Sequence, residues 1–215
     1  MRSSAPLSVV IPTLDAARDL PASLAAIDAA RGSGLLREIV VADGGSADAT
    51  AAIAQAAGAR VVPAPRGRGS QLGAGAAAAE GEWLCFLHAD TRPGPRWCEV
   101  VARFIADRAN GERAGYFRFR LDDEAAAARR LERMVAWRSR VLGLPYGDQG
   151  LVIAKRFYTG LGGFPARRSV GRQWEIVRVR FDGISPRPGN IGDRIDAWFP
   201  NIRDGGSEPQ GCWEN

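Results

Sequence analysis

The chain has 215 residues, of which 46% are hydrophobic and 25% are charged, and its formal net charge is +5. This length allows one sizeable core, and this composition is typical of a soluble globular protein. No apolar run approaches the ~18 residues of a membrane span, and no signal-peptide core precedes the first predicted strand, so we expect a cytoplasmic protein. The arginines are scattered without a helix-turn-helix or RNA-binding signature, which argues against a nucleic-acid partner.

The three cysteines are widely spaced and form no CxxC pair; they are Cys85, Cys98 and Cys212. This spacing indicates reduced thiols and argues against a disulfide framework or a cysteine zinc site.

Apolar strand patterns and helical patterns alternate along the first 90 residues. The strand patterns fall at 7–11, 38–42, 60–62 and 83–88, and the helical patterns fall at 19–30, 48–57 and 70–79. The connections are too long for hairpins, so we expect a doubly wound parallel sheet with right-handed crossovers. The helix at 70–79 consists mainly of small residues and could pack very closely.

The second half of the chain continues with mixed elements. We expect helices at 95–107, 125–142 and 155–160, and strands at 115–121 and 151–154. The helix at 125–142 is basic and amphipathic, with one roughly apolar face made of Leu131, Met134, Val135, Val141 and Leu142. It could contact a membrane surface or an acidic partner, whereas the plainer interpretation is an ordinary surface helix over the sheet.

Polar or glycine-rich loops follow the first four predicted strands. They are residues 12–15, 43–46, 66–69 and 88–90. Because ligands of open parallel sheets bind at the carboxyl ends of the strands, these loops predict a binding site at one sheet edge. Asp43 could accept hydrogen bonds from a ribose or a pyrimidine base, or it could simply anchor an Asx-turn and a helix cap.

Two arginines alternate with glycines just before a predicted helix, in the run Arg66-Gly67-Arg68-Gly69. Free backbone amides, the helix dipole and bidentate guanidinium groups all favour a phosphate there. The alternative is a solvent-exposed turn, and the spacing is not the dinucleotide fingerprint.

The strand at 83–88 ends at the only histidine of the chain, His88, which is followed by Ala89 and Asp90. A single carboxylate can help hold Mg²⁺ when diphosphate oxygens and water supply the remaining ligands. His88 could be a second ligand or support the first. The alternatives are a capping aspartate and a histidine that bonds to the backbone.

These motifs together resemble family 2 glycosyltransferases, and in particular a small bacterial branch of the arsenosugar-biosynthesis type. The motifs are Ser8-Val-Val-Ile-Pro-Thr13, Ile39-Val-Val-Ala-Asp-Gly-Gly-Ser46, Arg66-Gly-Arg-Gly69, Phe86-Leu-His-Ala-Asp-Thr91, Leu144-Pro-Tyr-Gly-Asp-Gln-Gly150 and Gly162-Gly-Phe-Pro165. The resemblance covers about residues 7 to 165. It implies an α/β GT-A fold, with a mostly parallel Rossmann-like sheet flanked by helices, and an inverting transfer from a nucleotide sugar.

The resemblance also implies roles for residues at matching positions. The implied nucleotide-binding residues are Pro12, Thr13, Asp15, Asp43, Gly44, Arg66, Arg68, Gly69, His88, Ala89 and Asp90. Asp90 and His88 would hold Mg²⁺ or Mn²⁺, although His-Ala-Asp has one carboxylate fewer than the Asp-x-Asp of many relatives. Tyr146, Asp148 and Gln149 would face the sugar or the acceptor, with Asp148 in a catalytic role.

The sequence departs from the family after Pro165. Arg172-Gln173 stands where an acidic pair is expected to supply the general base that an inverting transfer needs. Glu175 is the candidate substitute, and Asp182 is a second one. A diverged segment or a change of reading frame near residue 166 would explain the departure, so we divide the chain into a glycosyltransferase domain at 1–165 and a loop-rich or partly disordered segment at 166–215.

Three hypotheses for function follow. The first is transfer of a sugar from a nucleotide sugar such as a UDP-sugar to an acceptor hydroxyl whose identity the sequence leaves open. The second is a non-catalytic or impaired nucleotide-sugar binder, which the missing acidic pair favours. The third is a Rossmann-type enzyme that binds a dinucleotide or S-adenosylmethionine, which should have a glycine-rich turn where this chain has Pro12-Thr13-Leu14-Asp15.

Overall fold

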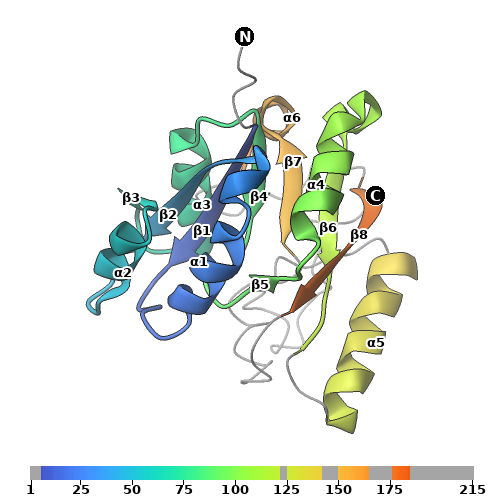
Figure 1. Cartoon of the computed structure of the whole chain (residues 1–215), viewed down its shortest axis with the longest axis horizontal. Helices are drawn as coiled ribbons and strands as arrows, with labels where there is room; N and C mark the ends of the chain where they lie inside the picture. Colours follow the sequence, from blue (N-terminus) through green and yellow to red (C-terminus); the bar gives the residue numbers. More distant parts are fainter. Residues whose placement is uncertain (1–5, 122–124, 142–149, 165–175, 185–215) are drawn as a thin grey trace, which may run out of the picture.

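The computed structural model describes residues 6–121, 125–141, 150–164 and 176–184. Within these ranges one mixed sheet of eight strands runs through the molecule in the order β3-β2-β1-β4-β7-β6-β8-β5 (Figure 1). The strands are β1 (Leu7–Thr13), β2 (Leu36–Asp43), β3 (Arg60–Pro63), β4 (Trp83–Phe86), β5 (Arg92–Pro93), β6 (Ala114–Arg118), β7 (Leu151–Ala154) and β8 (Ile176–Ile184). The α-helices are α1 (Leu20–Asp28), α2 (Thr50–Ala56), α3 (Arg68–Ala78), α4 (Trp97–Ala106), α5 (Ala126–Val141) and α6 (Lys155–Gly160), with 3₁₀ turns at Arg31–Ser33 and Arg108–Glu112.

The first four strands form a parallel unit, as the sequence predicts. β1 pairs in parallel with β2 and β4, and β2 pairs in parallel with β3. The register brings Thr13 opposite Asp43, and Asp43 opposite Pro63, so the carboxyl ends of these strands meet at one edge. This register positions the predicted binding loops side by side.

The second half of the sheet is mixed. β7 runs antiparallel to β4 and β6, and β8 is parallel to β6 and antiparallel to β5. β5 and β8 are strands that the sequence analysis does not predict. β8 lies within 166–215, so part of that region joins the same sheet; the division of the chain at residue 165 stays a prediction.

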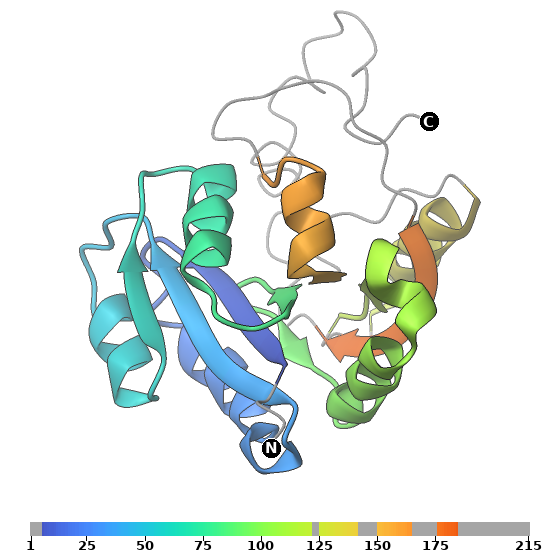
Figure 2. The same cartoon turned by 90° about the horizontal axis from the view of Figure 1, so that it is seen from above.

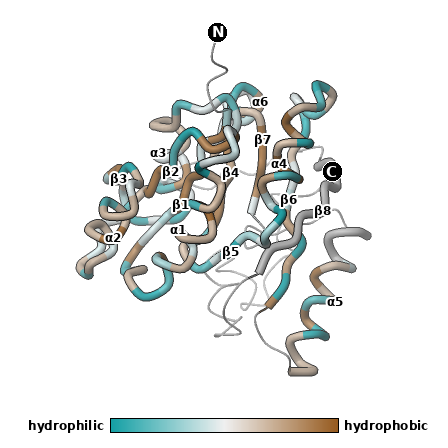
Figure 3. Tube along the Cα trace, viewed as in Figure 1, coloured by the Kyte–Doolittle hydropathy of each residue, from teal (hydrophilic) through white to brown (hydrophobic). Residues whose placement is uncertain are grey.

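Helices cover both faces of the sheet because the central strands are apolar on both sides. Val9 and Ile11 of β1 belong to the core beneath α1 and α4, whereas Val10 belongs to the core beneath α3 and α6. In Figure 2 the blue α1 and the blue-green α3 lie on opposite sides of the sheet. Figure 3 shows the hydrophobic residues concentrated along β1, β4 and β7.

α3 packs unusually close to the sheet, as its small residues predict. A Cβ on Gly75 would lie 2.4 Å from Val10 Cγ1 and 3.3 Å from Ala42 Cβ. The glycine therefore sets the distance between the helix and the two strands β1 and β2. This distance also fixes where the first turn of α3 lies at the sheet edge.

Two of the three cysteines lie in the described residues, and both are free in the structure. Cys85 is a free cysteine buried in β4, and Cys98 is a free cysteine in α4. Burial raises the pKa of the Cys85 thiol far above its ordinary value, so this side chain behaves as a small hydrophobic group. Cys212 lies outside the described residues.

Candidate donor site at the carboxyl edge of the sheet

A cavity of about 380 Å³ lies where the predicted loops meet, and we call it the edge cavity. Its lining residues are Pro12, Thr13, Leu14, Asp15, Ala16, Asp19, Gly67, Arg68, Gln71, His88, Ala89 and Asp90. Seven of the eleven predicted nucleotide-binding positions are among them. Asp43, Gly44, Arg66 and Gly69 are absent from this lining.

Asp43 is surrounded by hydrogen bonds from its own edge of the sheet. Its Oδ1 accepts from Thr13 Oγ1 at 2.9 Å and from the Ser46 hydroxyl. Its Oδ2 accepts from the backbone N–H groups of Gly45 at 3.1 Å and Ser46 at 2.9 Å. These four bonds occupy the four lone-pair positions of the carboxylate.

The charge on Asp43 is therefore held in place by the protein itself. Burial favours the neutral acid, but the hydrogen bonds from Ser46, Thr13 and Gly45 outweigh it, and the pKa of Asp43 lies below its ordinary value. The geometry is that of the Asx-turn alternative, in which the carboxylate organises the loop. A base or ribose that bonded to this carboxylate would have to displace one of the two hydroxyl donors.

The loops after β1 and β2 are tied together in a second place. The Asp15 N–H donates to Ser46 Oγ at 2.9 Å, and the Ala47 N–H donates back to Asp15 Oδ1 at 2.7 Å. Asp15 adopts a left-handed conformation, with a φ of 50°, which aspartate tolerates better than most residues. Ser46 thus links Asp15 and Asp43 and holds one wall of the edge cavity.

Gln71 is a buried member of the site that the sequence analysis misses. Its side-chain amide donates to the carbonyl oxygens of Thr13 and Ala42, so it ties the first turn of α3 to the ends of β1 and β2. Gly44 permits this contact, because a Cβ there would lie 2.9 Å from Gln71 Nε2. The sequence feature that could have pointed to Gln71 is that it is a polar glutamine within a helix rich in Gly and Ala.

The basic loop contributes one arginine to the cavity. Gly67 precedes α3 with a φ of 127°, a conformation that favours glycine, and Arg68 opens the helix in a half-buried position. Arg66 is exposed and lies outside the lining. The amino end of α3 and the Arg68 side chain therefore supply positive potential at the cavity, as an anionic ligand requires.

The segment after β4 forms the opposite wall. The Ser23 hydroxyl of α1 donates to the Ala89 carbonyl at 2.7 Å, and the Thr91 N–H donates to the His88 carbonyl at 3.1 Å. His88 and Asp90 are half-buried and line the same cavity. The turn is thus fixed to α1, and it presents an imidazole and a carboxylate next to Ala89.

These two side chains are a donor set that suits a divalent cation. Carboxylate oxygen is the preferred protein ligand of Mg²⁺ and Mn²⁺, and imidazole is an acceptable neighbour for Mn²⁺. Among the residues that the structure describes, no group of three or more His, Cys, Asp or Glu side chains could hold a metal ion. A cation bound by His88 and Asp90 would therefore need the ligand phosphates and water to complete its coordination.

Four further site predictions fall outside the described residues. They are the sugar or acceptor positions Tyr146, Asp148 and Gln149 and the candidate base Glu175. Asp182 lies in β8, where its backbone pairs with Arg118 of β6.

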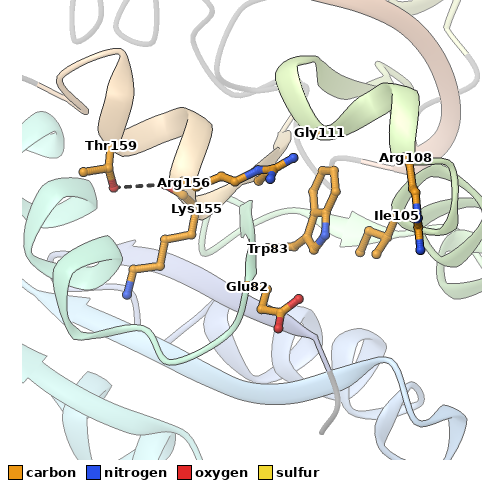
Figure 4. A pocket seen from close by; sticks show the side chains of 9 residues that line it. Glu82, Trp83, Ile105, Arg108, Gly111, Lys155, Arg156 and Thr159 are labelled. Carbon is orange, nitrogen blue, oxygen red and sulfur yellow. Dashed lines mark hydrogen bonds between the residues drawn. The ribbon is translucent and has the colours of Figure 1, made fainter. Parts of the chain in front are cut away.

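A larger hollow, of about 850 Å³, lies at the other edge of the sheet, where β4 begins and β7 ends (Figure 4). Figure 4 shows Arg156 extending toward Trp83 and Lys155 extending away from it. The Lys155 ammonium donates to the Ala79 carbonyl at the end of α3, and the Glu82 carboxylate adds a negative charge to the rim. Among the described residues that line this hollow there is neither a histidine nor an aspartate, so it lacks the imidazole and carboxylate pair of the edge cavity.

The family model described as glycosyl transferase family 2 matches residues 8–143. The chain belongs to this family. The match includes all the residues that line the edge cavity and ends before the predicted acceptor loop. No curated protein sequence matches the chain.

Solved structures support the same fold. Glucosyl-3-phosphoglycerate synthase from Mycobacterium tuberculosis, solved with Mn²⁺, UDP and glucosyl-3-phosphoglycerate, is 24% identical with a TM-score of 0.56, over 74% of this chain and 60% of the synthase. The same synthase with Mg²⁺ and UDP gives 23% identity and a TM-score of 0.56, with the same coverage. A mycobacterial protein is 20% identical with a TM-score of 0.63, over 91% of this chain and 72% of that one.

These likenesses confirm the predicted GT-A arrangement of the sheet and its helices. The chain spans about 60% of the length of the synthase. The narrower resemblance to the arsenosugar-biosynthesis branch stays a prediction.

Proposed function

We propose that this chain binds a nucleotide sugar in the edge cavity and transfers the sugar to an acceptor hydroxyl. The observation that carries the proposal is the composition of one cavity. The amino end of α3 with Arg68, the Thr13–Asp15 loop and the His88–Asp90 turn all line it. Arg68 and the free backbone amides at the amino end of α3, together with a carboxylate and an imidazole that suit a cation, fit a diphosphate.

We propose a UDP-sugar as the donor. The synthase from Mycobacterium tuberculosis shares the fold and was solved with UDP and with UDP-glucose. In this chain the loops after β1 and β2 would contact the nucleoside, with Asp15 in the cavity lining and Asp43 hydrogen-bonded to Thr13 beside it. Since the Asp43 carboxylate already accepts four hydrogen bonds, its role would be to hold the loop rather than to bond directly to the base.

We propose Mg²⁺ or Mn²⁺ as the cofactor, with Asp90 and His88 as its protein ligands. Such a cation neutralises the charge that builds on a departing nucleoside diphosphate. Arg68 would act on the same phosphates as a bidentate donor. Ser23 would keep the turn in place through its bond to the Ala89 carbonyl.

An inverting transfer also needs a base that takes the proton from the acceptor hydroxyl as it attacks the anomeric carbon. We propose Asp148 or Glu175 for this role, with Tyr146 and Gln149 at the sugar or the acceptor. The presence of Arg172-Gln173 in place of an acidic pair favours a second candidate function, a nucleotide-sugar binder without transferase activity. The dinucleotide hypothesis is weakened because the loop after β1, residues 12–15, contains no glycine.

Isothermal titration calorimetry on the full chain would separate these functions. UDP, GDP, NAD and S-adenosylmethionine would each be titrated with Mn²⁺ and with a chelator. We expect UDP to bind and to bind more tightly with Mn²⁺. Binding of NAD or S-adenosylmethionine without metal, and no heat from UDP, would contradict the proposal.

A turnover assay would then distinguish a transferase from a binder. Hydrolysis or transfer of a UDP-sugar by the full chain, measured as release of UDP, is expected if a base is in place. UDP binding with no release under any donor would support the non-catalytic function.

A further inference from the structure

α5 has two different long faces. On the inner face Ala128 and Val135 are buried and Leu131 is half-buried, in a small cluster with Phe119 and Leu121. This cluster is separate from the two cores that flank the central strands. α5 lies at the margin of the molecule in Figure 1. The apolar contacts of the inner face with Phe119 and Leu121 therefore hold α5 against the rest of the protein.

The only acidic residue of α5 also belongs to the inner face. Glu132 is 8% exposed, and its carboxylate accepts from the Leu121 N–H at 2.8 Å and from Arg129 Nη1 at 2.7 Å. The negative charge of Glu132 is thus satisfied by these two hydrogen bonds, which include one to the segment after β6. The acid contributes little negative potential to the outer side of the helix.

The outer face carries exposed arginines together with exposed apolar side chains. Arg130, Arg133, Met134 and Trp137 are spaced i, i+3, i+4 and i+7, so they form one stripe, which we call the outer stripe. Met134 is 58% exposed and Trp137 is 57% exposed. The sequence analysis is wrong in grouping Met134 with Val135 on one face, because Met134 is exposed whereas Val135 is buried.

Exposure of this kind is rare in the rest of the described chain. Among the described residues, Leu14 is the other large hydrophobic side chain that is exposed, and it lies at the edge cavity. No helix in the described ranges has the length and apolar composition to cross a membrane. A contact made by the outer stripe would therefore lie along a surface.

We propose that the outer stripe docks onto the surface of a membrane that contains anionic lipids. Tryptophan and methionine would enter the headgroup region, and Arg130 and Arg133 would bind lipid phosphates. The charge is complementary, because the stripe holds two arginines and no acid. A groove would favour a peptide or a second copy, but neither the edge cavity nor the larger hollow is lined by a residue of the stripe. The proposal does not depend on the function of the edge cavity.

Vesicle flotation of the full chain would test this proposal. Vesicles of phosphatidylglycerol and phosphatidylcholine would be compared with vesicles of phosphatidylcholine alone. We expect binding to the anionic vesicles, and a binding constant that falls as salt rises. Equal binding to both kinds of vesicle, or none to either, would overturn the proposal.

Paired variants would locate the contact on the stripe. We expect Arg130→Gln with Arg133→Gln, and separately Met134→Ser with Trp137→Ser, each to weaken binding by roughly tenfold or more. Arg103→Gln with Arg108→Gln is the control for net charge, because both arginines are exposed and lie far from the stripe in sequence. Unchanged binding of the stripe variants, or an equal loss in the control, would overturn the assignment.

Circular dichroism would verify that each variant keeps its fold, as substitution of exposed residues predicts. Sedimentation velocity would test whether a second copy of the chain occupies the outer stripe, because it measures the oligomeric state. A dimer of the wild-type chain that Met134→Ser with Trp137→Ser dissociates would overturn the lipid proposal and assign the stripe to self-association.

Discussion

Asp43 illustrates how one side chain can organise two loops of a candidate site. It connects the end of β1, through Thr13, with the turn after β2, through Gly45 and Ser46. Because Ser46 Oγ also accepts a hydrogen bond from the Asp15 N–H, the two loops are bonded directly to each other. Preorganised loops of this kind lower the entropy that ligand binding must overcome.

Replacing Asp43 with asparagine should therefore destabilise the protein. The amide can accept at one atom only, so at least one buried donor of this cluster would lose its partner, at a cost of about 1–3 kcal/mol. Urea denaturation of Asp43→Asn would measure the loss. Glu112→Gln, at an exposed site, is the matched control and should change stability little; equal stability of the two variants would contradict this role for Asp43.

The same hydrogen bonds predict how stability depends on pH. For Asp43, and for Glu132 on the inner face of α5, burial raises the pKa, but hydrogen bonds outweigh it and the net pKa is lowered. A lowered folded-state pKa gives stability that is present above the unfolded value of about 4 and is lost as pH falls through the folded value. Thermal melts from pH 7 to pH 3 should show this loss, with a shallower decline in Asp43→Asn. A melting temperature that does not change over this range would contradict it.

At the scale of elements, the close packing of α3 rests on Gly75. We expect Gly75→Ala to lower the free energy of unfolding by about 1–3 kcal/mol, because the added methyl would overlap Val10 in a tightly packed core. This cost should exceed the helix-propensity gain of about 1 kcal/mol. Chemical denaturation would measure it.

Gly73→Ala is the matched control, in the same helix. Its nearest neighbour would be the Phe164 carbonyl oxygen at 3.5 Å, an ordinary contact. The variant should be neutral or slightly more stable. If both substitutions had the same effect, the close approach of α3 to β1 would not be the cause.

Elements with strong periodicity could be predicted from the sequence. The strand at 151–154 and the helix at 155–160 have the predicted bounds, and the predicted strand at 115–121 is shorter, at Ala114–Arg118. β5 has two residues and no periodicity to detect. β8 contains the alternating run Val177 to Phe181, a period-two signal that the analysis passed over in a segment rich in Gly, Pro and charge.

The candidate site could be predicted as far as its loops but not its contacts. Polar strand ends identify the edge, since parallel strands bring those ends together. They do not reveal that Asp43 bonds inward, or that Gln71 joins α3 to Thr13, because both depend on distances between elements far apart in sequence. The face of α5 was assigned partly wrongly for the same reason, since the position of Phe119 decides which side is buried.

At the scale of the whole molecule, the two cavities and α5 lie in separate parts of the described structure. The edge cavity lies at the carboxyl ends of β1 and β4, and the larger hollow lies at the other edge of the sheet. α5 lies at the margin of the molecule (Figure 1). A membrane contact through α5 would leave the edge cavity free for a donor from solution. A cytoplasmic location stays a prediction.

The central claim is that the edge cavity binds a nucleoside diphosphate together with a cation held at Asp90. The most direct test is the affinity for UDP, measured by calorimetry with Mn²⁺ and with a chelator, in the wild-type chain and in Asp90→Asn. We predict that Mn²⁺ strengthens UDP binding by tenfold or more, about 1.4 kcal/mol, in the wild type and little in the variant. Glu112→Gln should behave as the wild type. An equal response to Mn²⁺ in Asp90→Asn, or no response in the wild type, would contradict the account.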